Sequence, residues 1–272
     1  MPRFTTSDGV SLYFTDEGEG LPLLCLSGLS RSGRDFDYVA PHLSGVRLIR
    51  LDYRGRGQSD WAPHESYTIP TEGRDALELL DHLGIEKAAV LGSSRGGLIA
   101  MGLAATVKER LLGVALNDIG PEIADRGLEV IKDYLGRRPS WKTVEAAVAA
   151  RPKVMAGFAN VPETRWRQEV ATHYREVADG LDITYDPKLR DAVLADGAQV
   201  VPDLWPFFDA LAELPLCMIR GAHSDLLAES CFDQMVQRRP DAVAVQVADR
   251  GHIPFLDEPE ALAALRKWLA MM

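Results

Sequence analysis

The sequence lacks the features that mark membrane and secreted proteins. Its 272 residues contain no uninterrupted apolar run of the roughly 18 residues that a membrane-spanning helix needs. The opening residues Met1, Pro2, Arg3 and Phe4 lead straight into a strand-like segment, without the apolar h-region of a signal peptide. We therefore expect a cytoplasmic protein that does not associate with membranes.

Cysteine and basic side chains are both scarce. The three cysteines (Cys25, Cys217 and Cys231) are odd in number and lack the spacing of zinc ligands, which favours free thiols in a reducing compartment. The 40 acidic residues outnumber the 30 basic ones, for a net charge of −10. An acidic chain argues against nucleic acid as a partner, because phosphates need Lys or Arg to neutralise them. With no glycine-rich dinucleotide fingerprint and no clustered metal ligands, we predict no cofactor and a small-molecule substrate, with the protein a monomer or homodimer.

What the sequence does contain is a regular alternation of strand and helix patterns. An Asp8-Gly9 turn joins two short strand-like segments at the start, and helical spacing of apolar residues marks segments around 76–83, 98–105 and 261–269. Such alternation predicts a mostly parallel sheet with helices on both faces. The further strands are expected at residues 21–26, 46–51, 87–91, 111–116, 214–219 and 243–247.

Residues 119–205 interrupt this alternation. They hold helical stretches with several aromatic side chains, broken repeatedly by proline, and no obvious strand of the sheet. Because one sheet strand ends before this segment and another begins after it, we predict a helical cap at 119–205 inserted into a core made of residues 1–118 and 206–272. The alternative is an additional helical layer without a lid function.

The strongest chemical signal is the hexapeptide Gly92-Ser93-Ser94-Arg95-Gly96-Gly97. It follows a predicted strand and opens a predicted helix, which is the context that a G-x-S-x-G nucleophile elbow requires. Glycine is needed on both sides because a serine in so sharp a turn leaves no room for neighbouring side chains. We therefore predict that Ser94 is a nucleophile.

A serine nucleophile needs a base, and the base needs a carboxylate. Among six histidines, His252 lies in a Gly/Pro-flanked loop after the last predicted strand, and His223 is its rival. For the carboxylate we favour Asp225, in the loop after strand 214–219, over Asp118, which also follows a strand. The order Ser94, Asp225, His252 is the one this kind of fold uses.

The loops around the nucleophile supply further candidates. Backbone N–H groups of Arg95 and of Leu29, in the segment after strand 21–26, are expected to form an oxyanion hole, and Gly28 would let a substrate approach closely. Arg31 and Arg95 lie beside this hole, as does Arg34. A buried arginine needs water, an internal carboxylate such as Asp35 or Asp37, or an anionic ligand. We therefore consider Gly28, Arg31 and Arg95 as substrate-binding residues, with Arg95 anchoring a carboxylate, against internal salt bridges.

Together with the segment Asp52-Tyr53-Arg54-Gly55-Arg56-Gly57-Gln58-Ser59-Asp60, these motifs resemble the α/β-hydrolase superfamily over essentially the whole chain. The resemblance implies an eight-stranded sheet with the cap inserted after the sixth strand, which ends at Asn117, and a structural role for Asp52 and Arg54. Two positions depart from the family pattern: Ser27-Gly28 replaces His-Gly, and Arg95 follows the nucleophile.

Within that superfamily, length and cap are similar to those of esterases, enol-lactonases and carbon–carbon bond hydrolases. Members with an aspartate nucleophile (epoxide hydrolases and haloalkane dehalogenases) or a cysteine nucleophile are excluded by Ser94. We expect hydrolysis of an ester, lactone or similar acyl compound through an acyl-enzyme. The alternatives are carbon–carbon cleavage of a diketone, and a lyase or ligand-binding protein that retains the fold.

Overall fold

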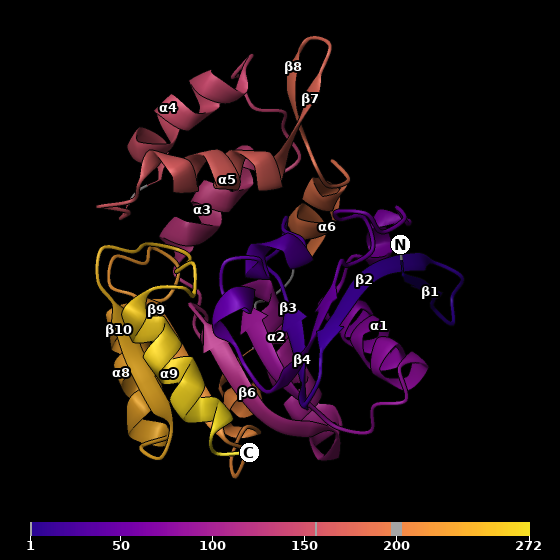
Figure 1. Cartoon of the computed structure of the whole chain (residues 1–272), viewed down its shortest axis with the longest axis vertical. Coiled ribbons are helices and arrows are strands. Elements are labelled where there is room, and N and C mark those ends of the chain that lie inside the picture. The colour runs from indigo at the N-terminus through magenta and orange to yellow at the C-terminus, as the bar shows by residue number, and fades with distance from the viewer. Residues whose placement is uncertain (1, 156, 197–202) are drawn as a thin grey trace.

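The described residues form an eight-stranded, mostly parallel sheet. Helices cover both faces of this sheet (Figure 1). The computed structural model describes residues 2–155, 157–196 and 203–272. Strands β1 and β2 run antiparallel to their neighbours and the remaining pairs are parallel. The predicted fold class is confirmed. In sheet order the strands are β1 (Arg3–Thr5), β2 (Ser11–Gly18), β4 (Val46–Leu51), β3 (Leu21–Leu26), β5 (Ala88–Ser93), β6 (Leu111–Asn117), β9 (Leu216–Gly221) and β10 (Val243–Val247).

Side chains alternate along the parallel strands and enter two different cores. On β3, Leu24 and Leu26 join the core of one face, whereas Leu23 and Cys25 join the core of the other. Burial on both faces explains why these strands read as unbroken apolar runs. The first face is covered by α1 (Ile69–His82), α2 (Arg95–Thr106), α7 (Trp205–Asp209) and α8 (Glu229–Arg238), and the second by α9 (Pro259–Leu269).

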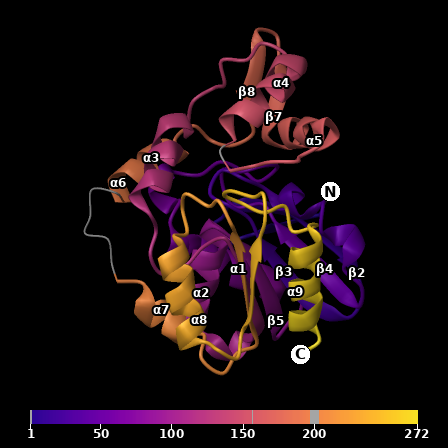
Figure 2. The same ribbon diagram turned by 90° about the vertical axis from the view of Figure 1, so that its left-hand side faces the viewer.

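An upper layer lies over one edge of the sheet (Figures 1 and 2). It comes from the segment between β6 and β9, the region predicted as a helical cap, of which residues 156 and 197–202 lie outside the described part. No helix among the described residues is both long and apolar enough to cross a bilayer. The upper layer consists of α3 (Asp125–Tyr134), α4 (Val144–Val154), α5 (Glu163–His173), β7 (Tyr174–Val177), β8 (Gly180–Ile183) and α6 (Leu189–Asp196).

The hairpin β7–β8 was not expected in a segment read as helical. Its two antiparallel strands are joined by Ala178 and Asp179, and Gly180, the first residue of β8, has a φ of +140°. An Asp-Gly pair is a hairpin signal, so the sequence did contain the clue. The hairpin side chain of Leu181 packs with Val148, Trp166 and Phe255, which joins the upper layer to a loop of the sheet domain.

The register of the parallel strands brings their carboxyl ends to a common edge beneath the upper layer. Ser93 at the end of β5 pairs with Asn117 at the end of β6, and Asn117 pairs with Ile219 near the end of β9. Open α/β sheets bind ligands at the carboxyl ends of their strands. The loops that follow β3, β5, β6, β9 and β10 therefore surround one position.

Candidate active site

Ser94 lies in a sharp turn between β5 and α2. Its backbone has φ 51° and ψ −115°, a conformation that non-glycine residues rarely adopt. A Cβ on Gly92 would lie 2.5 Å from the backbone of Gly96, and one on Gly96 would lie 2.0 Å from the carbonyl oxygen of Leu26. The two glycines are thus required by close backbone approach, which is the context predicted from the hexapeptide. The turn also points the N-terminus of α2 at the serine.

His252 connects the serine to a carboxylate. Its Nε2 lies 3.0 Å from Ser94 Oγ, and its Nδ1 lies 2.7 Å from Asp118 Oδ2. An ionised carboxylate can only accept, so Nδ1 carries the hydrogen that Asp118 accepts. That tautomer leaves the Nε2 lone pair facing the serine, which can donate its hydroxyl hydrogen to it. The rival His223 makes no such contact with Ser94 within the described chain.

The carboxylate beside His252 belongs to Asp118, so the expectation that Asp225 occupies this position is wrong. Asp118 follows β6 directly, is fully buried and has a φ of +55°. Besides His252, it accepts hydrogen bonds from the Gly221 N–H at 2.8 Å and the Ser224 hydroxyl at 2.7 Å. Asp225 comes one residue later in the β9 loop.

The loop after β9 therefore has a different function from the one expected. It supplies donors that hold the carboxylate of Asp118 in place, and the Asp225 carboxylate makes no hydrogen bond to another described residue. Strand order explains the difference, because β6 lies between β5 and β9 in the sheet. The acid after β6 is one strand from the nucleophile, whereas the β9 loop is two strands away. Sequence alone offered Asp118 and Asp225 in equivalent positions after a strand.

The segment after β3 lies against the nucleophile. An ideal Cβ on Gly28 would lie 3.8 Å from Ser94 Cβ, and the N–H of Gly96 donates to the Ser27 carbonyl at 3.1 Å. The N–H of Leu29 donates to no other described residue. Arg95 is the first residue of α2, so its N–H precedes the intrahelical ladder. Both expected oxyanion donors thus lie in segments that border Ser94.

The Asp52–Asp60 segment braces this loop, as the family resemblance implied. Asp52 Oδ1 accepts the Gly33 N–H at 2.7 Å, and its Oδ2 accepts the Gln58 N–H at 2.9 Å. Arg54 forms a bidentate pair with the buried Asp75, with both nitrogens 2.7 Å from carboxylate oxygens. Asp52 and Arg54 therefore hold backbone and helix positions and do not contact Ser94.

The Arg95 side chain has an internal partner. Its Nε lies 2.5 Å from Glu72 Oε2, and its Nη2 lies 2.9 Å from the Tyr67 carbonyl. Glu72 also pairs with Arg56 at 2.8 Å. Although burial favours protonation, Arg56 and Arg95 together hold the pKa of Glu72 below its usual value. The expectation that Arg95 anchors a substrate carboxylate is thus not supported. The alternative, an internal salt bridge, accounts for its side chain, but the acid is Glu72 and neither Asp35 nor Asp37.

Arg31 reaches the candidate site but shares its charge with two acids. It lies 3.9 Å from Asp35 and 3.5 Å from Glu169 of α5, and it contacts His173. Burial lowers the pKa of Arg31, but the Asp35 and Glu169 carboxylates outweigh that effect and raise it above its usual value. Arg31 therefore stays charged, with its charge offset by neighbouring acids.

His173 lies in the same buried cluster and is neutral. Burial lowers the pKa of His173 well below its usual value, and the adjacent Arg31 guanidinium lowers it further. Its Nε2 lies 3.0 Å from Asp35 Oδ1. Burial raises the pKa of Asp35. The sequence singled out neither His173 nor the cap residues beside it, because nothing local distinguishes them from other polar residues of an amphipathic helix.

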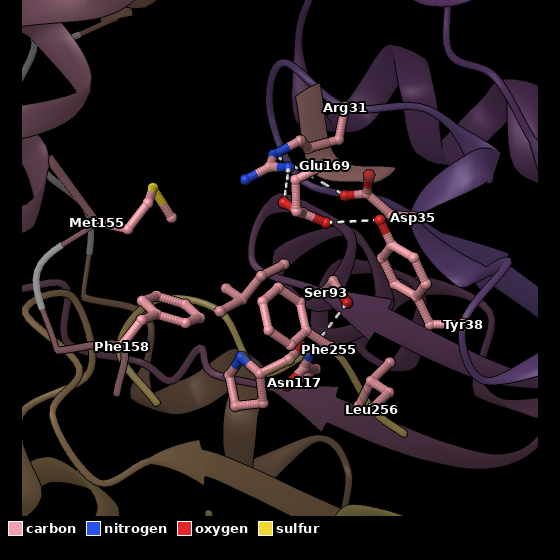
Figure 3. Close-up of a pocket in the computed structure, with 12 residues that line it drawn as sticks. Arg31, Asp35, Tyr38, Ser93, Asn117, Met155, Phe158, Glu169, Phe255 and Leu256 are labelled. Atoms are coloured by element: carbon pink, nitrogen blue, oxygen red, sulfur yellow. Dashed lines mark hydrogen bonds and ion pairs between the residues drawn. The ribbon is translucent and has the colours of Figure 1, made fainter. Parts of the chain in front are cut away.

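A cavity lies where the upper layer meets the sheet edge (Figure 3). Arg31, Asp35, Tyr38 and Glu169 form one polar side of it, and Phe158 and Phe255, whose ring centroids are 5.4 Å apart, lie opposite. Ser93 and Asn117 reach it from the strand ends. Its wall also includes the segment Ile253, Pro254, Phe255 and Leu256, which directly follows His252.

The fold agrees with the comparisons to known proteins. Residues 23–265 match the model of the alpha/beta hydrolase family, and the chain belongs to this family. The family match, together with relatives that include an oligomer hydrolase and an esterase, supports a hydrolase.

Three relatives are similar over nearly their whole length. The chain is 37% identical to the 3-hydroxybutyrate-oligomer hydrolase of Cupriavidus necator, over 89% of this chain and 85% of that protein. It is 32% identical to Haloalkane dehalogenase 2 of Mycobacterium tuberculosis, over 96% of this chain and 92% of the relative. A crystal structure of an alpha/beta hydrolase from Novosphingobium aromaticivorans superposes with a TM-score of 0.93 at 35% identity, covering 100% of this chain and 98% of the other.

Proposed function

We propose that the protein hydrolyses a carboxylic ester through an acyl-enzyme formed on Ser94. The observation that carries the proposal is the continuous hydrogen-bonded series from Ser94 through His252 to Asp118, with Ser94 in a strained elbow. An alcohol oxygen is a weak nucleophile until a base takes its proton, and His252 Nε2 is in position to do so. Asp118 fixes the tautomer and stabilises the imidazolium that forms.

The reaction divides into two half-reactions. Ser94 Oγ forms a bond to the ester carbonyl carbon as its proton passes to His252 Nε2. The tetrahedral intermediate then collapses, the bond to the leaving alkoxide breaks, and His252 returns the proton to that oxygen. Water enters, gives a proton to His252 and attacks the acyl carbon, and Ser94 leaves with that proton to release the acid. Each half-reaction balances without a cofactor.

Negative charge develops on the carbonyl oxygen in both tetrahedral states. The N–H groups of Leu29 and Arg95 are the donors we assign to this oxygen, supported by the positive N-terminal end of α2. Donors of this kind contribute about 3–4 kcal/mol of transition-state stabilisation each. The upper layer, α3 to α6 in the described part of the predicted cap 119–205, serves as the cap that bounds the substrate cavity from above.

Ester hydrolysis is favoured over the other reactions of the fold by two features. The relative from Cupriavidus necator is described as an oligomer hydrolase of 3-hydroxybutyrate, and the units of a hydroxy-acid oligomer are joined by ester bonds. Dehalogenation is disfavoured, because the family resemblance links that reaction to an aspartate nucleophile and this chain has Ser94 at the elbow.

A substrate panel tests this proposal. It should compare 4-nitrophenyl esters, lactones, a diketone and the dimer of 3-hydroxybutyrate under one set of conditions. We expect saturating hydrolysis of esters and inactivation by a serine-reactive phosphonate, with the phosphonyl group on Ser94 in peptide mass spectra. Cleavage of the diketone alone would contradict ester hydrolysis and favour carbon–carbon bond cleavage by the same residues.

A further inference from the structure

Arg151, near the end of α4, is a buried cation without a carboxylate. Arg151 is only 7% exposed to solvent. No acidic side chain of the described residues lies within ion-pair distance of its guanidinium, and its Nε has no hydrogen-bond partner there. Its described contacts are the Met155 sulfur at 3.3 Å, the His173 Nδ1 at 3.5 Å and the ring of Tyr174 at 5.4 Å. None of these carries a negative charge.

The other buried arginines of the described chain are compensated. Most pair with acids, as Arg54 does with Asp75 and Arg95 with Glu72. Arg220 has no acid, but it donates to two carbonyl oxygens and to the Gln246 side chain. Removing a guanidinium from water costs several kcal/mol unless an anion or strong acceptors replace the water. Arg151 has neither, so the folded protein holds an unused anion-binding group.

Arg151 is positioned beside the candidate site. Met155, which its Nη1 contacts, lines the cavity of Figure 3. His173 lies between Arg151 and Arg31 and contacts both. Arg31 in turn reaches the loop beside the nucleophile, because its Cγ lies 3.2 Å from an ideal Cβ on Gly28. Arg151 is therefore linked through His173 to Arg31, which lies in the loop that borders Ser94.

The neighbouring charges single out Arg151 within this cluster. Asp35 and Glu169 are both close to Arg31, and the Tyr38 hydroxyl donates to Glu169 at 2.8 Å. His173, the group between the two arginines, is neutral because burial and the Arg31 charge lower its pKa. Among the described residues of this cluster, Arg31 is therefore compensated by carboxylates and Arg151 is not.

We infer that Arg151 receives a carboxylate of the substrate, which makes the preferred substrate an ester that carries a free carboxylate. This inference rests on the proposed ester hydrolysis and specifies its substrate class. A guanidinium binds a carboxylate through two parallel N–H···O bonds, which gives orientation as well as affinity. Arg151 is thus a specificity residue that holds one end of the substrate while Ser94 attacks the ester carbonyl.

The test compares acidic esters with neutral partners of the same shape. One pair is the 3-hydroxybutyrate dimer and its terminal amide; the other is 4-nitrophenyl hydrogen glutarate and its terminal amide. The two pairs place the carboxylate on the alcohol side and on the acyl side of the ester. The enzymes are wild type, Arg151→Met, Arg151→Lys and, as control, Arg167→Met, which removes an exposed cap arginine paired with Glu145 and Glu163.

In at least one pair, wild type should prefer the acid, and Arg151→Met should lower kcat/KM for the acid by about tenfold to a hundredfold. The same variant should change kcat/KM for the amide by less than about twofold, and Arg151→Lys should retain part of the preference. Arg167→Met should behave as wild type. Equal use of acid and amide by wild type in both pairs would overturn the inference, as would a preference that survives in Arg151→Met.

A binding measurement separates this inference from the proposed chemistry. In a Ser94→Ala background, the 3-hydroxybutyrate dimer should raise the melting temperature, its amide should not, and the effect should disappear with Arg151→Met. Because Arg151 has no internal acid, Arg151→Met alone should not lower the melting temperature. If wild type hydrolyses no ester yet the acid stabilises only proteins with Arg151, the proposed function fails and the anion site stands. If wild type hydrolyses esters but Arg151→Met does not change binding of the acid, the proposed function stands and the anion site fails.

Discussion

His252 and Asp118 face each other at 2.7 Å across two loops that are 134 residues apart in the chain. The Asp118 carboxylate is fully buried and also accepts from the Gly221 N–H and the Ser224 hydroxyl. Every one of these groups donates to the ionised carboxylate, which therefore stays an acceptor for the imidazole. Asp118 is therefore the acid that orients His252, the base that faces Ser94.

The first prediction concerns that acid. Asp118→Asn should lower kcat by about a thousandfold or more, because an amide in this position stabilises the wrong His252 tautomer. Asp225→Asn is the matched control and should stay within a few-fold of wild type, since its carboxylate does not contact the histidine. Steady-state kinetics on a nitrophenyl ester compares them. A crippled Asp225→Asn beside an active Asp118→Asn would reverse the assignment.

A second prediction concerns the elbow. Gly96→Ala should destabilise the protein by about 1–3 kcal/mol, since the new Cβ would lie 2.0 Å from the Leu26 carbonyl oxygen. Gly102→Ala in the same helix is the control, because a Cβ there meets nothing within 4 Å. That change should be neutral or stabilise by up to about 1 kcal/mol. Urea unfolding of both variants measures the difference, and equal midpoints would show that the turn tolerates a side chain at position 96.

The third prediction concerns pH. The folded state holds the pKa of His173 well below its usual value, so the unfolded state takes up a proton at a higher pH than the folded state does. The stability of the folded protein should be complete above pH ~6.5 and fall below it, with this residue contributing up to about 1.4 kcal/mol per pH unit. The titration takes place among Arg31, Arg151, Asp35 and Glu169.

Urea unfolding at pH 7.0 and 5.0 provides the test for His173. The loss of stability between these values should be smaller in His173→Gln than in wild type. His64→Gln, which changes a partly exposed histidine beside Glu65, should keep the wild-type loss. An identical loss in wild type and His173→Gln would mean that His173 titrates alike in the folded and unfolded states.

A fourth prediction separates Arg95 from substrate recognition. Arg95→Met should destabilise the fold by about 1–3 kcal/mol, because it removes one of the two arginines that pair with the buried Glu72 and leaves Arg56. The ratio of kcat/KM for an acidic ester over its amide should stay at the wild-type value. A lost preference for the acid, with unfolding free energy unchanged, would instead place Arg95 at the substrate.

The sequence predicted the fold well because the relevant signals are local. Buried parallel strands read as short apolar runs, and the elbow around Ser94 requires glycines at fixed positions. His252 was also identified locally, from its place in a loop after the last strand. These features depend on residues next to one another in the chain, and no long-range geometry is needed to interpret them.

The sequence could not resolve choices that depend on distance across the sheet. Asp118 and Asp225 both follow a strand, and only the strand order places Asp118 beside His252. Arg95 pairs with Glu72, 23 residues earlier and on another helix, whereas the sequence suggested nearer acids. Arg151 carries no local signal either, because a charged residue on a helix is ordinarily solvated. Its meaning comes from burial and from the absence of a carboxylate among the described residues around it.

The central claim is that Ser94 is the nucleophile, and the most direct test is the residual activity of Ser94→Ala. Its kcat/KM on a nitrophenyl ester should fall below about a hundredth of the wild-type value, because loss of the nucleophile costs several orders of magnitude. Its melting temperature should stay at the wild-type value, since alanine fits the same turn. An Ser94→Ala protein that is folded and keeps more than about a hundredth of wild-type kcat/KM would contradict the account.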